Sequence, residues 1–288
     1  MEPSIRYEEP LPGVARVVLA RSEARNAQDK RLLYELNDAF DRAAQDDAVK
    51  VVILAGDGPH FSAGHDLRDF VADPSNGGLL GGHNPVGCWG GFDLPGAEGW
   101  MAMEQELFLG LCWRWRNFPK PIIAAVQGKA IAGGLMLVWV CDLIVAADDA
   151  EFSDPVVAFG LNGHEYFVHP YEVGARRAKE MLFTGEAISA EEARQLGMVN
   201  RVVPRADLER EAVALAGRMA RQPSIGLKLA KQAVNQSLDA QGQWTTLQAA
   251  LSLHEIGHSH NMQLFGIPVD PNGAQVIREL SRPEAPDG

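Results

Sequence analysis

The chain has 288 residues, of which 46% are hydrophobic and 22% are charged, and its formal net charge at pH 7 is −12. This composition is ordinary for a globular protein, and the length is sufficient to bury a core that needs no disulfide or metal. The excess of acidic side chains argues against a nucleic-acid-binding surface and against a polybasic contact with a membrane.

The sequence predicts neither a membrane helix nor export. The longest uncharged apolar run, Ala130–Cys141, is far shorter than the roughly 20 residues that span a bilayer. The N-terminal segment carries acids where a signal peptide has basic and then apolar residues, which favours a cytoplasmic protein. The cysteines form no C-x-x-C pair, so we expect buried, reduced thiols at Cys88, Cys112 and Cys141.

The first half of the chain contains two β-α-β patterns. Strands are expected over Val14–Ala20 and Val49–Ala55, joined by an amphipathic helix that Asp29 caps. The alternation of strands and helices predicts parallel strands and right-handed crossovers. The second pattern consists of a strand over Ile122–Val126, a helix over Gly133–Cys141 and a strand over Leu143–Ala147.

The remaining segments predict a loop and a helical tail. Residues 72–99 are rich in glycine and proline, so a long loop is expected, and a helix buried on one side follows over Trp100–Trp115. Ser189 opens a capping box for a further helix. We expect an α/β body in residues 1–204 and a helical region in residues 205–288, with helices over Arg205–Arg221, Ser224–Leu238 and Gln243–Met262.

Two glycine-containing turns are the most informative segments. Gly56–Leu67 and Val126–Leu135 each carry glycines where the chain leaves a strand, and the second precedes a helix N-terminus, which favours a negative oxygen. Glycines after a strand are also ordinary turn residues. Together, however, the two turns can each deliver one backbone N–H, as an oxyanion hole for a thioester carbonyl requires.

The sequence as a whole resembles the crotonase superfamily, which is the enoyl-CoA hydratase/isomerase family. The resemblance implies an α/β fold, a spiral of ββα units with a helical C-terminal region that builds homotrimers, often paired into hexamers. It implies an acyl-CoA or enoyl-CoA substrate and neither a metal nor a redox cofactor. It covers most of the chain and is carried by Ala24–Ala27, Phe61–Leu67, Gly128–Gly134, Cys141–Asp142, Leu182–Gly185, Ala193–Val199 and Val202–Pro204.

The resemblance also implies site residues by position. The oxyanion donors would be the backbone N–H groups of His65 and Gly133. The adenine and phosphate end of coenzyme A would lie along Arg25, Ala27, Ala63, Asp66, Leu67 and Arg68.

The chain departs from the family pattern where hydratases carry two glutamates. Here these positions are Met136 and Val156. Hydration of an enoyl thioester needs a base that activates water and an acid that protonates the α-carbon. Neither a thioether nor an isopropyl group exchanges a proton, so the usual hydratase chemistry is not expected from these two positions.

Other residues are candidates for carrying the proton. Asp154 and Glu165 are carboxylates near the implied acyl end, and the imidazoles of His164 and His65 have ordinary pKa values close to neutrality. Each carboxylate also has a structural explanation. Asp154 can cap the segment after it, and Glu165 can form an ion pair with one of the arginines at 176 and 177.

A second motif points to different chemistry. His254, Glu255 and His258 match H-E-x-x-H, in which the two histidines share one helical face and can bind zinc while the glutamate activates water. Gly257 inside this helix and the absence of the extended motif weaken that interpretation. With eight histidines in the chain and His260 nearby, a chance match to the motif or a packed histidine cluster at an oligomer interface is expected instead.

Three functions therefore remain open. The first is an acyl-CoA enzyme, nominally an enoyl-CoA hydratase/isomerase, that stabilises a thioester enolate through His65 and Gly133. The second is a non-catalytic acyl-CoA-binding protein. The third is a zinc hydrolase built on His254 and His258.

Overall fold

The computed structural model describes residues 3–69 and 78–280 of the chain. Within these residues the strands are β1 (Ile5–Leu11), β2 (Val14–Leu19), β3 (Val51–Gly56), β4 (Ile122–Val126), β5 (Lys129–Ile131), β6 (Leu143–Ala147), β7 (Glu151–Ser153), β8 (Ile188–Ser189) and β9 (Arg201–Val203).

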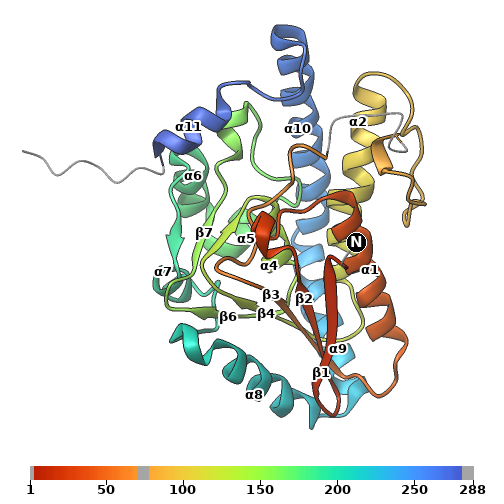
Figure 1. Ribbon diagram of the computed structural model, residues 1–288, viewed down its shortest axis with the longest axis vertical. Helices are drawn as coiled ribbons and strands as arrows, with labels where there is room; N and C mark the ends of the chain where they lie inside the picture. The colour runs from red at the N-terminus through yellow and green to blue at the C-terminus, as the bar shows by residue number, and fades with distance from the viewer. Residues whose placement is uncertain (1–2, 70–77, 281–288) are drawn as a thin grey trace, which may run out of the picture.

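Helices surround these strands (Figure 1). The α-helices are α1 (Lys30–Gln45), α2 (Ala97–Glu104), α3 (Leu111–Arg116), α4 (Gly133–Trp139), α5 (His169–Val173), α6 (Ala175–Thr184), α7 (Ala190–Gln195), α8 (Leu208–Ala220), α9 (Ser224–Ala240), α10 (Gln243–Phe265) and α11 (Gly273–Leu280). The 3₁₀ segments are η1 (Ser22–Ala24), η3 (Gly78–Leu80), η5 (Val156–Phe159) and η6 (Arg205–Asp207), and η4 (Gln105–Gly110) is a π-helical segment.

The main sheet has six strands in the order β1-β2-β3-β4-β6-β9. β1 pairs antiparallel with β2, and each later pairing is parallel, as the alternation of strands and helices predicts. Its central strands are apolar and buried on both faces, because α1 packs beside β1 and β2 while α8 lies across β3, β4 and β6.

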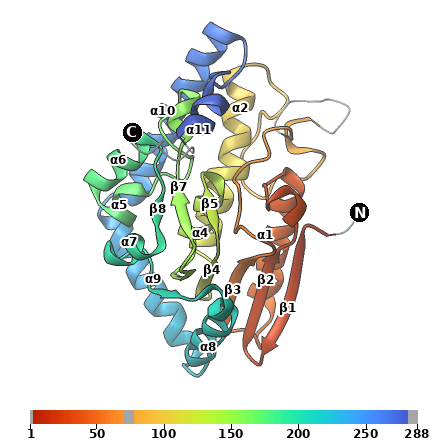
Figure 2. The same cartoon turned by 60° about the vertical axis from the view of Figure 1, so that its left-hand side comes forward.

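A second, smaller layer holds the turns that leave the main sheet. β5, β7 and β8 form a three-stranded sheet (Figure 2). Two isolated parallel bridges, Gln28–His65 and Ser62–Ala130, join the loops after β2 and β3 to the segment that contains β5. The segments that follow β2, β3 and β4 therefore lie side by side, each bridged to the next. Both glycine-containing turns belong to these segments.

The helix that begins at α2 differs from its prediction in one respect. α2, η4 and α3 follow one another without interruption over the expected Trp100–Trp115 segment, but the middle turn is π-helical. Met103, Leu107 and Leu111 are buried in the main core, as the one-sided pattern predicts. Of the expected 72–99 loop, residues up to 77 lie outside the described residues, and the described part contains η3 and the first turn of α2.

The C-terminal region is helical from η6 onward. α8, α9 and α10 match the three predicted helices within a few residues, whereas α11 had no prediction. The separation of residues 1–204 and 205–288 into domains stays a prediction. No helix among the described residues is both long and apolar enough to cross a bilayer. Cys112 is buried, but the expectation of a buried thiol is wrong for Cys88, which is exposed in the glycine-rich segment.

Candidate active site

The two glycine-containing turns come together at Gly64 and Gly133. Gly64 has a φ of +89°, and a Cβ added there would lie 3.3 Å from the Gly133 nitrogen and 2.7 Å from the Ile131 carbonyl oxygen. Only glycine allows this approach without strain. The backbone at residues 64–65 and the start of α4 are thus in direct contact, as an oxyanion site formed by both would require.

The start of α4 presents its N–H groups at this contact. Gly133 is the first residue of the helix, so its N–H has no intrahelical acceptor, and the positive end of the helix dipole lies at the same place. Ala132 before it has a φ of 48°, an unfavourable value for a residue with a side chain. Such strain is typical of functional sites.

The imidazole of His65 lies against Gly133. A Cβ on Gly133 would be 2.6 Å from Cε1 and 2.8 Å from Nδ1 of this ring. The ring stacks on Phe108, with centroids 4.0 Å apart, and its Nε2 lies 3.2 Å from Oε2 of Glu165. Residue 65 therefore brings both a backbone N–H and a titratable ring to one place.

Glu165 holds this ring from a loop about 100 residues farther along the chain. Its side chain is 7% exposed; burial raises the pKa of its carboxyl, but His65 and His254 outweigh that effect and bring the pKa to about 2. The carboxylate accepts from Nε2–H of His65, which leaves Nδ1, the nitrogen beside Gly133, as the basic one in the neutral ring. Arg177, the alternative partner for Glu165, pairs with Glu192 instead.

Asp154 is fully buried and belongs to a separate group, the Asp154 cluster of Asp154, His164 and His169. Its carboxylate accepts from the N–H of Val156 at 3.2 Å, from the N–H of His164 at 2.8 Å and from Nε2 of His169 at 2.8 Å. Burial raises the pKa of Asp154, but the two histidines hold it well below its usual range, and burial lowers the pKa of His164 to about 3.

The residues at the two positions where hydratases of the family carry glutamates, Met136 and Val156, are apolar and at least partly buried. Met136 lies in α4 within the main core and is 2% exposed, and Val156 begins η5 and is partly buried. Neither side chain offers a proton, and the backbone N–H of Val156 donates to the buried Asp154 carboxylate.

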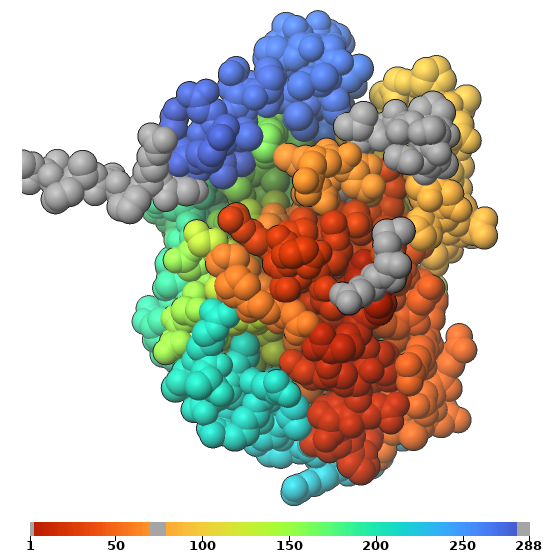
Figure 3. Space-filling view, viewed as in Figure 1, coloured from red at the N-terminus to blue at the C-terminus, as the bar shows by residue number. Residues whose placement is uncertain are grey.

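The residues assigned to coenzyme A lie along two adjacent segments. The Ala63 N–H donates to the Arg25 carbonyl, and the buried Asn26 side chain donates to the carbonyls of Asp57, His60 and Phe61. Figure 3 shows these N-terminal and residue-60 segments, in red and orange, side by side on the surface. The role of Asn26 was not predicted, although it lies within a quoted motif.

The chemistry of these segments differs from residue to residue. Arg25 and Arg68 are exposed cations, and Leu67 is 60% exposed. Asp66 is buried and pairs with Arg21 and Arg68 at 3.2 Å each, so its charge is compensated by the protein itself. Ala27 and Ala63 are partly buried between them.

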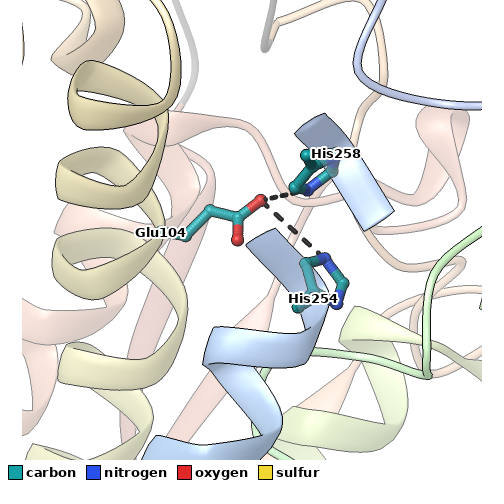
Figure 4. Close-up of side chains that lie close together, drawn as sticks. All are labelled: Glu104, His254 and His258. Atoms are coloured by element: carbon teal, nitrogen blue, oxygen red, sulfur yellow. Dashed lines mark hydrogen bonds and ion pairs between the residues drawn. The ribbon is translucent and has the colours of Figure 1, made fainter. Parts of the chain in front are cut away.

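A second cluster links α2 to α10. We call it the Glu104 cluster: Glu104, His254 and His258 (Figure 4). Glu104 Oε1 lies 2.8 Å from Nε2 of His258 and 3.9 Å from Nε2 of His254. Burial lowers the pKa of His258, but Glu104 outweighs it and raises the pKa to about 9. The H-E-x-x-H histidines thus form the packed cluster expected from the sequence, whereas Glu104 was not predicted, because no local motif marks it.

Comparison with known proteins agrees with the fold and the motifs. A sequence model described as enoyl-CoA hydratase/isomerase matches residues 10–78 and 91–267. The chain is 42% identical over 266 residues, 91% of its length and 83% of the relative, to the putative enoyl-CoA hydratase EchA13 of Mycobacterium tuberculosis. It is 33% identical over 241 residues to the 2,3-dehydroadipyl-CoA hydratase of Escherichia coli, with 82% of each chain covered.

A solved structure has a similar overall fold. The crystal structure of a probable enoyl-CoA hydratase from Mycobacterium thermoresistibile superposes with a TM-score of 0.83 at 47% sequence identity, covering 93% of this chain and 100% of that one. The resemblance seen in the sequence is confirmed, and with it the crotonase fold. The chain belongs to the enoyl-CoA hydratase/isomerase family of enzymes.

Proposed function

We propose that the protein binds an acyl- or enoyl-CoA thioester and stabilises its enolate, with the carbonyl oxygen held by the N–H groups of His65 and Gly133. The observation that carries this proposal is the contact between Gly64 and the Gly133 nitrogen. The positive end of α4 favours the charge that develops on the oxygen. The two relatives, a putative enoyl-CoA hydratase and a 2,3-dehydroadipyl-CoA hydratase, are both named for CoA thioesters, which agrees with this substrate class.

His65 is the proton carrier in this proposal, and Glu165 is its positioning residue. The contact between Nε2 and Oε2 at 3.2 Å fixes the ring, and Nδ1 lies on the side of Gly133. A buried carboxylate behind an imidazole selects the tautomer and stabilises the imidazolium that forms during proton transfer. Asp154 is a poorer candidate, because both of its oxygens already accept hydrogen bonds within a fully buried cluster.

One proton carrier suits a double-bond shift better than hydration. In a 3-enoyl-CoA, Nδ1 of His65 removes a proton from the α-carbon, the electrons pass into the thioester dienolate, and the same proton returns to the γ-carbon to give the 2-enoyl-CoA. Hydration would in addition require a group that activates water. Met136 and Val156 supply none, so we propose isomerisation as the main reaction.

The remaining assignments complete the proposal. Arg25, Ala27, Ala63, Asp66, Leu67 and Arg68 border the coenzyme A end. The chain acts as a homotrimer or hexamer without a redox cofactor. Support for an oligomer comes from large apolar side chains that α9 and α10 expose, among them Ile225, Leu229, Val234, Leu253, Ile256 and Leu264. A buried interface removes such surface from water.

The test compares turnover of a 3-enoyl-CoA and of crotonyl-CoA by the purified full-length protein. His65→Ala keeps the backbone N–H but removes the ring, so kcat for isomerisation should fall by about 10²-fold or more. Glu165→Gln should lower kcat by roughly 10- to 100-fold with little change in KM, and Glu165→Asp should restore part of the loss. His260→Ala, an exposed histidine on α10, is the matched control.

The outcomes separate the proposal from its alternative. Isomerisation that is lost in His65→Ala and retained in His260→Ala supports the proposal. Tight binding of both thioesters without turnover would instead identify a non-catalytic acyl-CoA-binding protein, as the apolar residues at 136 and 156 allow. Turnover unaffected by His65→Ala would contradict the assigned proton carrier.

A further inference from the structure

The two histidines of the Glu104 cluster both turn Nε2 of the imidazole ring toward Glu104. They lie at positions i and i+4 of α10, so both project from one face. Gly257 between them allows α10 to pack closely on the preceding loop, because a Cβ there would be 2.7 Å from the Gly160 carbonyl oxygen. This packing brings the loop residue Asn162 next to His254.

The outer ring nitrogens are both bonded to oxygen acceptors. Nδ1 of His258 donates to the Pro268 carbonyl at 2.6 Å. Asn162 donates its Nδ2 to the Ala250 carbonyl, so its Oδ1 faces His254 Nδ1 at 3.2 Å and accepts from it. Metal-binding histidines are commonly held by such bonds, which fix the tautomer and direct Nε2 toward the ion. Nε2 of His258 now donates to Glu104 Oε1 at 2.8 Å, so an ion bound there would replace this proton.

The inward nitrogen of His254 has no hydrogen-bond partner among the residues that the structure describes. The side chain is 2% exposed, and the nearest charged atoms to Nε2 are Glu165 Oε1 at 3.7 Å and Glu104 Oε1 at 3.9 Å. In the neutral ring this nitrogen presents a lone pair to two anionic oxygens, an arrangement that a cation between them would stabilise.

Further polar atoms at the same place lack partners in this part of the structure. Oε2 of Glu104 and both carboxyl oxygens of Glu255 are buried and accept from no N–H or hydroxyl group of the described residues. Burial and the neighbouring Glu104 carboxylate raise the pKa of the Glu255 carboxyl to about 8, so these two carboxyls face each other. The ion-pair partners of Glu104 and Glu165 among those residues are all histidines. Carboxyl groups and imidazoles are therefore gathered here, and the ion-pair partners of these carboxylates among the described residues include no lysine or arginine.

We propose that Glu104, His254 and His258 bind a divalent transition metal ion, for which zinc has the matching ligand preference. One ligand atom from each residue lies within 4.8 Å of the others, and two imidazoles with one carboxylate form a common zinc-binding set. Glu165 Oε1 is close enough to His254 to supply a fourth ligand after a small shift. This assignment departs from the metal-free protein that the family resemblance implies.

The proposed ion is structural and joins α2 to α10. The three ligand side chains are only 2%, 2% and 7% exposed, so a bound ion would be shielded from bulk water, although two histidines with one carboxylate are the ligand set of catalytic zinc sites. The Asp154 cluster contains similar residues, and its imidazoles also have nitrogens without a partner among the described residues. Both oxygens of its carboxylate, however, already accept hydrogen bonds, so an ion would have to displace them, and the proposal is confined to the Glu104 cluster.

The test measures metal binding and leaves catalysis aside. Untagged full-length protein is stripped with a chelator, reloaded with Zn²⁺ or Co²⁺, and analysed for metal content, for visible cobalt absorption and for thermal unfolding. We expect one ion per chain and a rise in Tm of about 5 °C when the metal is well above its Kd. Glu104→Gln and His258→Gln should weaken binding by about 10-fold or more, whereas His164→Gln and His260→Gln should not.

Circular dichroism of each metal-free variant confirms that it is folded. Stoichiometric metal that is lost in Glu104→Gln and His258→Gln supports the site. A wild-type protein that takes up no stoichiometric zinc or cobalt would overturn the proposal, and so would a folded Glu104→Gln variant that binds as tightly as wild type. Because no readout involves a thioester, this result is independent of the enolate chemistry.

Discussion

Two buried groups of one carboxylate and two histidines lie in the same chain, and they differ in how their carboxylates are hydrogen-bonded, whereas imidazole nitrogens without a partner among the described residues occur in both. In the Asp154 cluster the carboxylate accepts from two backbone N–H groups and one imidazole. In the Glu104 cluster one oxygen accepts from His258 and from Trp100, while the other oxygen has no partner among the described residues.

The difference suggests different purposes for similar residues. A buried carboxylate filled by local backbone donors orders the loop that carries those donors. A buried carboxylate left partly unfilled, beside an imidazole in the same condition, is costly unless something binds there. Residue type alone therefore does not identify a ligand site, and the hydrogen-bond partners of each atom are needed.

Matched amide substitutions should show the largest contrast. Asp154→Asn places an N–H₂ group opposite groups that already donate, so the free energy of unfolding should fall by about 3 kcal/mol or more. Glu104→Gln removes the ion pair with His258 but keeps one acceptor oxygen for it, so in metal-free protein the cost should be smaller, about 1–2 kcal/mol. Urea unfolding monitored by circular dichroism measures both, and equal losses would remove the distinction between the clusters.

The stability of metal-free protein should respond to pH with opposite signs at the two clusters. The folded pKa of His164 is about 3 against an ordinary 6.5, so the unfolded chain binds more protons between these values and stability is lost as pH falls. The folded pKa of His258 is about 9 against 6.5, so stability is lost as pH rises through that range.

Each effect should be on the order of 1 kcal/mol and should disappear with the histidine that causes it. Urea midpoints at pH 4.5, 7 and 9, with chelator present, would test this at roughly the edges of the two ranges. His164→Gln should reduce the loss on the acidic side. His258→Gln should reduce the loss on the alkaline side only in part, because the pKa of Glu255 is raised to about 8 and its deprotonation also costs stability as pH rises. A His258→Gln profile as steep as that of the wild type between pH 7 and 9 would contradict the assignment to His258.

A substitution outside both clusters should have the smallest effect. The Arg68 side chain is 86% exposed at the proposed coenzyme A end, so Arg68→Ala should raise KM for the thioester by about 2- to 5-fold without changing kcat or the unfolding free energy. Salt should reduce the difference between the two proteins. A large fall in kcat would instead place Arg68 near the reacting atoms.

Much of the fold could be predicted because its signals are local. β4 matches its predicted range residue for residue, and Asp29 caps α1 by accepting from Leu32 N–H at 2.7 Å. β1 was missed because acidic residues and Pro10 obscure its pattern. β5 and β7 have three residues each, too few for a period to appear.

The site was predictable only in part, because only some of its contacts have a local signal in the sequence. Glycines beside strands indicate where the backbone turns, so the contact of Gly64 with Gly133 could be expected. The choice of Glu165 as the partner of His65, and of Glu104 as the partner of His258, depends on how distant segments pack. The sequence left Asp154, Glu165, His164 and His65 as candidate proton carriers, and the proposal distinguishes them by their hydrogen bonds in the structure.

The most direct measurement of the central claim is hydrogen exchange at the α-carbon of a saturated acyl-CoA. In D₂O, enolisation by the proposed donors and by His65 should replace the α-protons of butyryl-CoA with deuterium, which proton NMR detects without any net reaction. We predict exchange with wild-type protein and with His260→Ala, and its loss with His65→Ala. Butyryl-CoA that binds to the wild-type protein yet retains its α-protons would contradict the account.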